Sequence, residues 1–271
     1  MRRAVRLGVV VAVLSTFPLL SGAGGAGAAI ARTHGRIAVL NANQSNNWSG
    51  YNQGTLEQGT TLFNQVSADW TVPTATQHTA GADEASSAWI GIGGGCIDAS
   101  CATTDSTLIQ AGTEQDVDAS GNPTYSAWYE LIPAPSISVS LTVRPGDLIH
   151  ADIHELVTGS HVWSITMNNR TTGQSFSTTV PYSSTRGSAE WILETPLGIG
   201  TGGVGLSNMP NLSTTHFNNA RRNNANANLK ASEEMQLVSG STIVADPSAP
   251  DSDANGFNDC TYASSCGTPS P

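Results

Sequence analysis

Residues 108–117 read LIQAGTEQDV, and this stretch decides the fold class. Gln110, Gly112, Glu114 and Asp116 occupy every second position in it. Successive side chains of a β-strand point to opposite faces, so these four side chains share one face. The stretch therefore predicts a β-strand with one polar, glycine-containing face.

Eight further stretches have the same character: they are short, mostly alternating, rich in Val, Ile, Thr and Trp, and separated by Gly, Pro or Asn turns. They are Val66–Val72, Ala88–Gly93, Tyr125–Leu131, Ile137–Val143, Leu148–Val157, Val162–Asn168, Phe176–Val180 and Ala189–Glu194. No stretch has the pattern of a long amphipathic helix. The sequence predicts an all-β chain, an antiparallel β-sandwich of the jelly-roll (concanavalin-like) type.

The predicted strands carry unusual residues on the face that does not enter the core. Trp89 alternates with apolar residues, Trp128 shares a face with Glu130, and Glu190 shares one with Glu194. Tryptophan, carboxylate and carboxamide groups among glycines are typical of a substrate groove. An ordinary solvated face with stray aromatic residues is the alternative. Alternation by itself does not show which strands are neighbours.

The first residues have the order of a secretory signal. Arg2, Arg3 and Arg6 precede the apolar run Leu7–Leu20, and small residues follow up to a predicted cleavage site after Ala28. This order is typical of an exported protein, with a retained membrane anchor as the alternative. We therefore expect a secreted, extracellular protein that does not contact membranes once residues 1–28 are removed.

Composition divides the rest of the chain into three segments. Residues 29–45 are predicted to be a pro-segment or flexible arm, and residues 46–245 a β-sandwich domain long enough for one substantial core. Residues 246–271 are rich in Asp, Ser, Pro and Gly and are predicted to be a C-terminal tail. The asparagine-rich stretch Asn218–Asn228 is predicted to be an exposed loop. We expect a monomer.

The charge balance excludes several classes of partner. The 271 residues include 11 basic and 21 acidic residues, a net charge of −10. Three of the arginines lie in the leader, so the rest of the chain has 8 basic residues against 21 acidic ones, or −13. Such a surface repels phosphate backbones and anionic lipids, which argues against nucleic-acid and membrane partners. Abundant neutral polar residues are suited to an acidic, extracellular setting.

The four cysteines fit an oxidising compartment. Cys96 and Cys101 are five residues apart, and Cys260 and Cys266 are six apart. Three connectivities are formally open, and proximity favours Cys96–Cys101 and Cys260–Cys266. Zinc binding is the alternative, but the spacing differs from that of zinc knuckles and no histidine is near. We predict two disulfides, no metal and no cofactor.

Among the residue types that catalyse hydrolysis, carboxylates are the main candidates in this sequence. The sequence lacks a Gly-x-Ser-x-Gly nucleophile motif. His150, Asp152 and His154 share one strand face, where a metal site is conceivable but a solvated polar face is favoured. Glu130 and Glu190 on facing strands would suit a glycosidase or a carbohydrate-binding module, with Trp89 and Trp128 stacking on sugar rings.

Six short motifs occur in order along the chain and together carry a family resemblance. They are Asn47–Tyr51, Ala68–Pro73, Ala88–Ile92, Leu108–Gly112, Ala127–Glu130 and Ala189–Glu194. This order resembles the glutamic peptidase (eqolisin) family, as a secreted member of bacterial type, and extends over roughly Asn46 to Asn219. The resemblance implies a β-sandwich endopeptidase that cleaves polypeptides at acidic pH through an activated water, without a covalent intermediate.

The resemblance also assigns roles to residues. The catalytic glutamine and glutamate of the family fall on Gln110 and Glu190, on the face that alternation separates from the core. Trp89 matches a tryptophan of the family's cleft, and Glu114 an acidic position after the glutamine strand; Trp128 and Glu194 are further predicted substrate contacts. The sequence departs from the fungal pattern in two respects. Gly93 stands where an aspartate is usual, and no cysteine flanks Glu190.

Overall fold

A computed structural model describes residues 31–200 and 203–271. The predicted signal segment and its cleavage site lie outside the described residues. Apart from η1, a short 3-10 helix at Ala231–Glu233, the described part of the chain is built from strands and loops. None of its helical structure is long and apolar enough to cross a bilayer.

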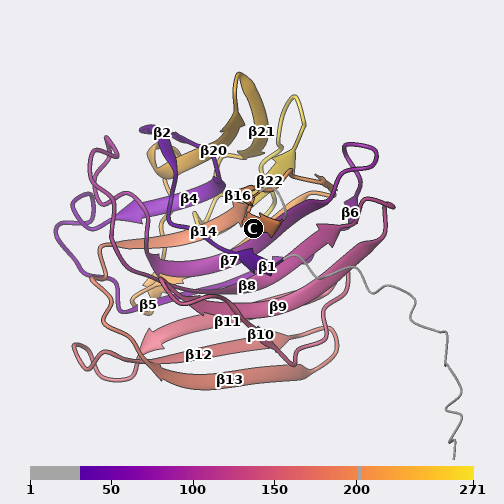
Figure 1. The fold of residues 1–271 in the computed structure, drawn as a ribbon. Helices are drawn as coiled ribbons and strands as arrows, with labels where there is room; N and C mark the ends of the chain where they lie inside the picture. Colours follow the sequence, from indigo (N-terminus) through magenta and orange to yellow (C-terminus); the bar gives the residue numbers. More distant parts are fainter. Residues whose placement is uncertain (1–30, 201–202) are drawn as a thin grey trace, which may run out of the picture. The chain divides into compact units, whose positions relative to one another are not determined.

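The first sheet is antiparallel, and it holds most of the residues singled out in the sequence (Figure 1). Its strands, in spatial order, are β10 (Ile137–Val139), β9 (Pro123–Leu131), β8 (Leu108–Val117), β7 (Glu84–Gly93), β14 (Ser188–Glu194), β4 (Trp48–Gly54) and β20 (Glu234–Ser239). Strand β14 inserts between β4 and β7, although it lies far from both in the sequence.

The second sheet packs against the first, and Figure 1 shows its strands β11, β12 and β13 in the lower half of the view. Its order is β13 (Gln174–Pro181), β12 (Val162–Asn169), β11 (Leu148–Glu155), β5 (Gln65–Thr71), β18 (Thr215–Arg222), β22 (Phe257–Thr261) and β21 (Thr242–Pro247). Strand β20 pairs with β4 through Glu234–Met235 and with β21 through Leu237–Ser239, so it joins the two sheets.

Short strands complete the structure. They are β1 (Ala31–Thr33), which pairs with β15 (Leu197–Gly200) and through it with β16 (Gly203–Leu206); β2 (Val39–Asn41) and β3 (Gln44–Ser45), which pair with each other; β6 (Ala75–Thr76) with β17 (Asn211–Leu212); and β19 (Ala225–Asn226), which pairs with β18.

Alternation correctly separates the two faces of the first sheet. The inward side chains, such as Ile90 and Trp191, pack with Trp70, Ile153 and Trp163 of the second sheet in the main core. The opposite face has its own apolar cluster, which includes Trp48, Trp89, Leu108, Trp128 and Ile192. The predicted antiparallel β-sandwich is confirmed, and the predicted strand Leu108–Val117 agrees with β8 at both ends.

The predicted exposed loop Asn218–Asn228 is wrong, because most of it belongs to β18 and β19. Ala220 and Ala227 are fully buried between the asparagines and tie this hairpin to the core. Asn223 and Asn224 form the turn at φ values of 48° and 63°, a conformation that asparagine tolerates better than most residues. The many asparagines therefore mark a tight turn rather than a long loop.

The segment predicted as a C-terminal tail also differs from expectation. Within it, β22 pairs with both β18 and β21, and Phe257 is fully buried in the main core. The short strand is hidden in the sequence by its Asp-, Ser- and Gly-rich flanks. Similarly, the predicted strand Ile137–Val143 stops at Val139, because the rest of it packs into the core without ladder pairing.

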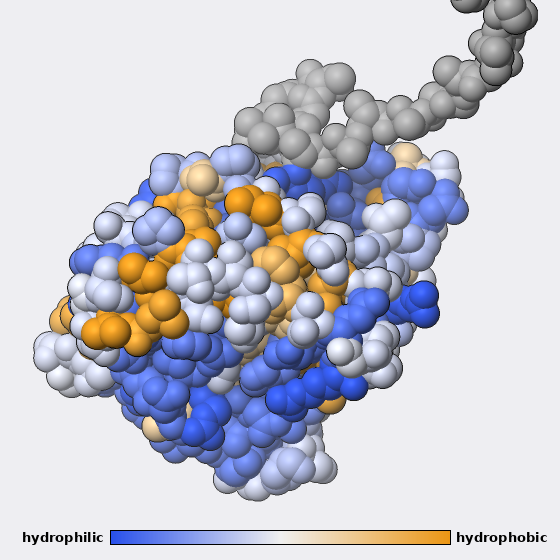
Figure 2. Space-filling view, turned by 90° about the horizontal axis from the view of Figure 1, so that it is seen from below, coloured by the Kyte–Doolittle hydropathy of each residue, from blue (hydrophilic) through white to orange (hydrophobic). Residues whose placement is uncertain are grey.

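The surface seen from below is mixed in polarity (Figure 2). Apolar residues gather on one half of that face and strongly polar residues on the other. The described chain has several exposed large apolar side chains, of which Val157 is 69% and Leu56 is 56% exposed. Singly exposed apolar side chains are common on protein surfaces.

Candidate active site

One row of residues crosses the first sheet and brings the two predicted catalytic residues onto the same face. Asn52 on β4 pairs with Glu190 on β14, which pairs with Gly91 on β7. Gly91 in turn pairs with Gln110 on β8, and Gln110 pairs with Glu130 on β9. Residues in register across a sheet point to the same side, so all four side chains of this row lie on the non-core face.

Gly91 keeps a gap between the glutamate and the glutamine. Glu190 and Gln110 are two strands apart, which places their Cα atoms about 10 Å from each other. A Cβ atom on Gly91 would lie 2.8 Å from Trp89 Cζ3 and 3.1 Å from Leu108 Cδ1. Trp89 and Leu108 therefore form an apolar floor between the two polar side chains, and a side chain at position 91 would collide with it.

Gln110 is held by one hydrogen bond and keeps further capacity. Its side chain is fully buried, and its Nε2 donates to Glu130 Oε2 at 2.9 Å. The same oxygen accepts the backbone N–H of His34, so Glu130 presents an acceptor to the Gln110 amide. Among the described residues, Gln110 Oε1 has no hydrogen-bond partner. One amide hydrogen and the amide oxygen thus remain for a ligand.

Glu190 is buried without partners. Its side chain is 0% exposed, and neither carboxyl oxygen has a hydrogen-bond partner within the described part of the chain. Loss of water through burial raises the pKa of Glu190 well above its usual range, and the neighbouring Ser188 offsets this only in part. A buried carboxyl with unused oxygens and a raised pKa is typical of a catalytic acid–base.

A tight loop covers Glu190 from one side. A Cβ atom on Gly95 would lie 2.7 Å from Glu190 Oε1 and 1.8 Å from Asn52 Oδ1, so only glycine fits there. Asn52 fixes this loop by donating to Cys96 O and accepting from Cys96 N–H, each at 2.9 Å. The Gly95 N–H donates to Ser188 Oγ at 3.1 Å. The loop thus closes over the Glu190 carboxyl.

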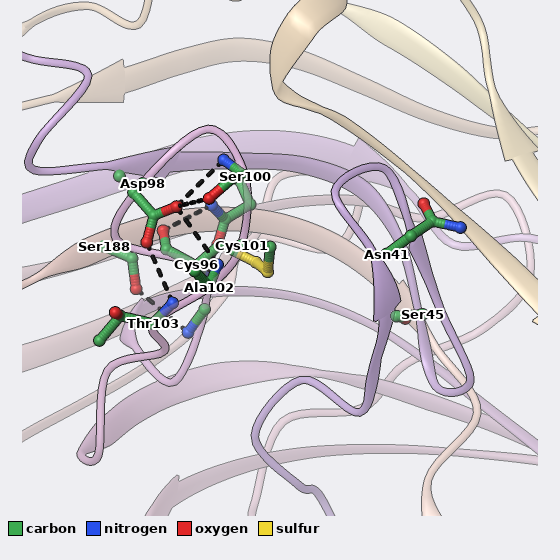
Figure 3. The surroundings of a disulfide bond; sticks show 12 residues. Asn41, Ser45, Cys96, Asp98, Ser100, Cys101, Ala102, Thr103 and Ser188 are labelled. Atoms are coloured by element: carbon green, nitrogen blue, oxygen red, sulfur yellow. Dashed lines mark hydrogen bonds between the residues drawn. A yellow bond between two sulfur atoms is a disulfide. The ribbon is translucent and has the colours of Figure 1, made fainter.

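The same loop continues into a disulfide. Cys96 pairs with Cys101, and Cys260 with Cys266, which are the pairings that proximity favours. Figure 3 shows how the Asp98 carboxylate accepts hydrogen bonds from Ser100, Ala102 and Thr103 and so braces the turn. The Cys96–Cys101 disulfide therefore stabilises the loop that covers Glu190.

Glu194, four residues beyond Glu190 on β14, forms a second buried unit with Trp89 of β7. Trp89 Nε1 donates to Glu194 Oε2 at 2.8 Å, and both side chains are 0% exposed. Burial is the largest effect on Glu194 and raises its pKa to about 8, although several donors, including the Gly35 N–H, act in the opposite direction. Trp89 is thus a structural donor to Glu194, in addition to its place in the apolar floor.

Trp128 and Glu114 lie on the same face but make different contacts. Trp128 is only 2% exposed, and its Nε1 donates to Ser87 Oγ at 3.1 Å. Glu114 lies 3.9 Å from Arg32, and burial, followed by the nearby Asp116, raises its pKa well above the usual range. The structure therefore gathers the six predicted catalytic and substrate-binding residues on one face of the first sheet.

A family model decides the classification. The model of the Peptidase A4 family matches residues 46–262. The chain belongs to the Peptidase A4 family. Scytalidopepsin B of Scytalidium lignicola is 36% identical over 137 residues, which are 49% of this chain and 46% of that protein. The matched region therefore spans about half the length of this curated relative.

Solved structures share the fold of this A4 family chain. A scytalido-glutamic peptidase with a transition state analog inhibitor aligns with a TM-score of 0.62 and 24% identity, covering 80% of this chain and 98% of that one. SCP-B, a member of the Eqolisin family of peptidases in a complex with the tripeptide Ala-Ile-His, aligns with a TM-score of 0.56 and 23% identity over the same shares. These similarities establish the concanavalin-like sandwich.

Several residues of this site could not be predicted from sequence patterns. Asn52 follows the Asn47–Tyr51 motif directly, and only the register of β4 against β14 places it beside Glu190. Arg32, Thr33 and His34 come from the segment predicted as a pro-segment or flexible arm. Thr33 and His34 nevertheless donate to Glu130, and Arg32 donates to Asp116. Neither strand alternation nor a family motif indicates these residues, because their contact partners are distant in the sequence.

The histidines of β11, His150 and His154, lie outside this site, on the second sheet. His150 Nδ1 lies 2.6 Å from Asp69 Oδ1, and His154 is hydrogen-bonded to Asp152 on the outer face of the second sheet. Asp152 also accepts from Gln65 Nε2 at 2.8 Å. Across residues 31–200 and 203–271, no group of three or more His, Cys, Asp or Glu side chains is arranged to hold a metal ion. These residues form a polar network.

Proposed function

We propose that this chain is an endopeptidase that hydrolyses peptide bonds with Glu190 and Gln110 and a water molecule. One observation carries the proposal: a buried carboxyl and a buried carboxamide, both with unused polar atoms, flank Gly91 on one sheet face. Family membership supports the same reaction class, and the tripeptide complex of SCP-B supports a polypeptide substrate. Secretion, acidic working pH, bacterial type and a monomeric state remain predictions.

The role proposed for Glu190 is proton transfer. It takes a proton from the attacking water and later delivers one to the leaving amine, which is general acid–base catalysis. Its raised pKa leaves only a small ionised fraction at about pH 3–4, makes that fraction a stronger base, and keeps the protonated form available as the acid. One carboxyl can therefore serve in both halves of the reaction.

The role proposed for Gln110 is orientation and charge stabilisation. Its unused Oε1 accepts a hydrogen bond from the water, and its second Nε2 hydrogen donates to the oxyanion that forms on the peptide carbonyl. A carboxamide keeps its hydrogen-bonding pattern at any pH, unlike histidine, which acid protonates. Glu130 positions this amide, a role that the sequence did not indicate.

The alternative, a glycosidase using Glu130 and Glu190, has less support. The two residues are three strand steps apart in the row, which places their Cα atoms about 14 Å apart, a wide spacing for two carboxyls that must act on one bond. Glu130 also faces Gln110 and the N-terminal segment, while Glu190 lies against Gly95 on the far side of the gap. This arrangement favours the peptidase over the glycosidase.

Digestion of a denatured protein at about pH 3–4, near the ordinary carboxyl pKa, tests the proposal. The full chain should release peptides, and Glu190→Gln should lose roughly 10²–10⁴-fold in rate because it cannot transfer a proton. Glu57→Gln, the same change at a partly exposed position, is the control. A folded Glu190→Gln protein with near-normal activity would rule out the mechanism. Release of reducing ends from polysaccharides would favour the glycosidase.

A further inference from the structure

The connection between β21 and β22 (Figure 1) has a spacing of acidic and amide side chains that is typical of calcium-binding loops. Residues 251–256 read DSDANG, so Asp251, Asp253 and Asn255 occupy every second position before a glycine. Calcium loops of this pattern use the alternate side chains as oxygen ligands. The glutamate that closes an EF-hand loop at the twelfth position is absent, since Tyr262 stands there. The oxygen ligands must therefore be completed from elsewhere in the fold.

Asp251 holds this turn with one carboxyl oxygen and leaves the other unused. Its Oδ1 accepts the backbone N–H groups of Asn255 and Gly256 at 3.0 and 3.1 Å. Its Oδ2 has no hydrogen-bond partner among the described residues, although Asp251 is only 5% exposed. A buried carboxylate oxygen without a donor is costly unless a ligand satisfies it.

The unused oxygen is not a general property of turns that an aspartate holds. Asp98, which braces the turn after Cys96, accepts the N–H of Ala102 with Oδ1 at 3.2 Å and the N–H of Thr103 with Oδ2 at 3.0 Å. Both oxygens of that carboxylate are thus used within its own loop. Asp251 differs because its second oxygen points away from the turn that the first one holds.

The Oδ2 atom of Asp251 faces other oxygens. A Cβ atom built on Gly256 would lie 2.4 Å from Asp251 Oδ2, 3.1 Å from Phe217 O and 3.2 Å from Asn218 Oδ1, and apart from its chain neighbours these are the atoms nearest to it. The Asn219 N–H donates to Asn218 Oδ1 at 2.7 Å, so this amide presents its oxygen here. Three oxygens that converge without a donor repel one another unless a cation or a water lies between them.

The chemistry of these groups favours calcium over other metals. A carboxylate, a carboxamide and a backbone carbonyl are the hard oxygen ligands that Ca²⁺ takes in sets of six to eight with flexible geometry, whereas Mg²⁺ demands a near-ideal octahedron. Zinc and copper would require nitrogen or sulfur ligands. With at most two carboxylates, Asp251 and Asp253, the site differs in kind from the clusters of three or more His, Cys, Asp or Glu side chains that the described residues lack.

We propose that Asp251, Asn218 and the Phe217 carbonyl bind a calcium ion that joins the β21–β22 connection to strand β18. The proposal departs from the sequence-based prediction of no metal. It is independent of the proposed peptidase reaction, because β18 and β22 belong to the second sheet and Glu190 to the first. A bound ion stabilises the folded chain by an amount that depends on its concentration. The low ligand charge predicts a dissociation constant of roughly 10⁻⁴–10⁻³ M.

The first test measures binding by isothermal titration calorimetry of the full chain with CaCl₂, after metal removal with EGTA, at about pH 6, where ordinary carboxyls are ionised. One Ca²⁺ should bind per chain, and Mg²⁺ roughly tenfold more weakly. Asp251→Asn keeps an acceptor for the turn but loses the charge, so it should weaken Ca²⁺ binding at least tenfold, on the order of one charged ligand. Asp98→Asn is the matched control and should bind as the wild type does.

The second test measures thermal unfolding by circular dichroism. CaCl₂ at about 10 mM should raise the melting temperature of the full chain by roughly 3–10 °C relative to EGTA. The shift should persist in Asp98→Asn and vanish in Asp251→Asn. Asp253→Asn changes an exposed ligand of the same loop, and it should reduce the shift even if Asp251→Asn does not fold.

Two results would overturn the proposal. If Ca²⁺ produces neither binding heat nor a melting shift, water alone satisfies Asp251 Oδ2. If the shift is equal in wild type, Asp251→Asn and Asp253→Asn, the ion binds elsewhere on this acidic chain. Neither measurement involves peptide cleavage, so both results are independent of whether Glu190 and Gln110 catalyse hydrolysis.

Discussion

Two buried carboxyls, one on the non-core face of each sheet, differ in the number of hydrogen bonds that they accept. Asp69 on β5 is 3% exposed and Glu190 on β14 is 0% exposed. Asp69 accepts hydrogen bonds from His150, Arg170 and Asn219, at 2.6, 2.7 and 2.8 Å. Glu190 accepts none from the residues that the structure describes.

The two carboxyls accordingly differ in their affinity for protons. Burial alone would raise the pKa of Asp69, but hydrogen bonds from His150 and Asn219 and the charge of Arg170 outweigh it and lower the pKa. Burial raises the pKa of Glu190 with little opposition. Burial alone therefore does not mark a functional carboxyl. Burial without partners does, because such a group retains polar atoms for a ligand.

The largest effect is expected on the face of Glu190. Gln110→Ala should lower turnover roughly 10²–10³-fold, since it removes an oxyanion donor. Combined with Glu190→Gln, the loss should be much smaller than the product of the two, because both act on one transition state. Asp152→Asn on the second sheet should leave turnover unchanged. Equal losses in Gln110→Ala and Asp152→Asn, with both proteins folded by circular dichroism, would remove the distinction between the faces.

Stability should fall as pH rises, because Glu194 on the first sheet is buried and its pKa is raised. The pKa of Glu194 is raised from 4.5 to about 8, so its contribution is fully present below about pH 4.5 and is lost as pH rises towards 8. Glu194→Gln mimics the protonated form and should remove a few kcal/mol of this pH dependence. Urea unfolding at pH 4 and pH 8 measures it, with Glu57→Gln as control. The same slope in wild type and Glu194→Gln would contradict the assignment.

The smallest effect, and one of opposite sign, is expected at Asp69. Because its pKa is lowered, its stabilisation is present above the ordinary value of 3.8 and is lost as pH falls. Asp69→Asn should cost about 1–2 kcal/mol of unfolding free energy at pH 7 and less at pH 2. Unfolding at both pH values checks this. A loss that grows towards low pH would contradict the paired, ionised state.

Sequence alone determined the faces of the strands. The period of two assigned Ile90 and Trp191 to the core and Trp89, Gln110 and Glu190 to the other face, and the structure agrees. This works because side-chain alternation is a local property of the extended backbone. The prediction of an exposed loop at Asn218–Asn228 rested on local composition and was wrong, because a few buried residues such as Ala220 tie this polar segment into a sheet.

Only the tertiary structure decided what the non-core face contains. The order β4–β14–β7–β8–β9 places Glu190, Gly91 and Gln110 in one row, and a shift of one residue in any pairing would turn a side chain into the core. The position of His34 between Trp128 and Glu194 likewise depends on contacts between distant segments. Strand order and register are set by how the whole chain buries its apolar faces, and no local pattern encodes them.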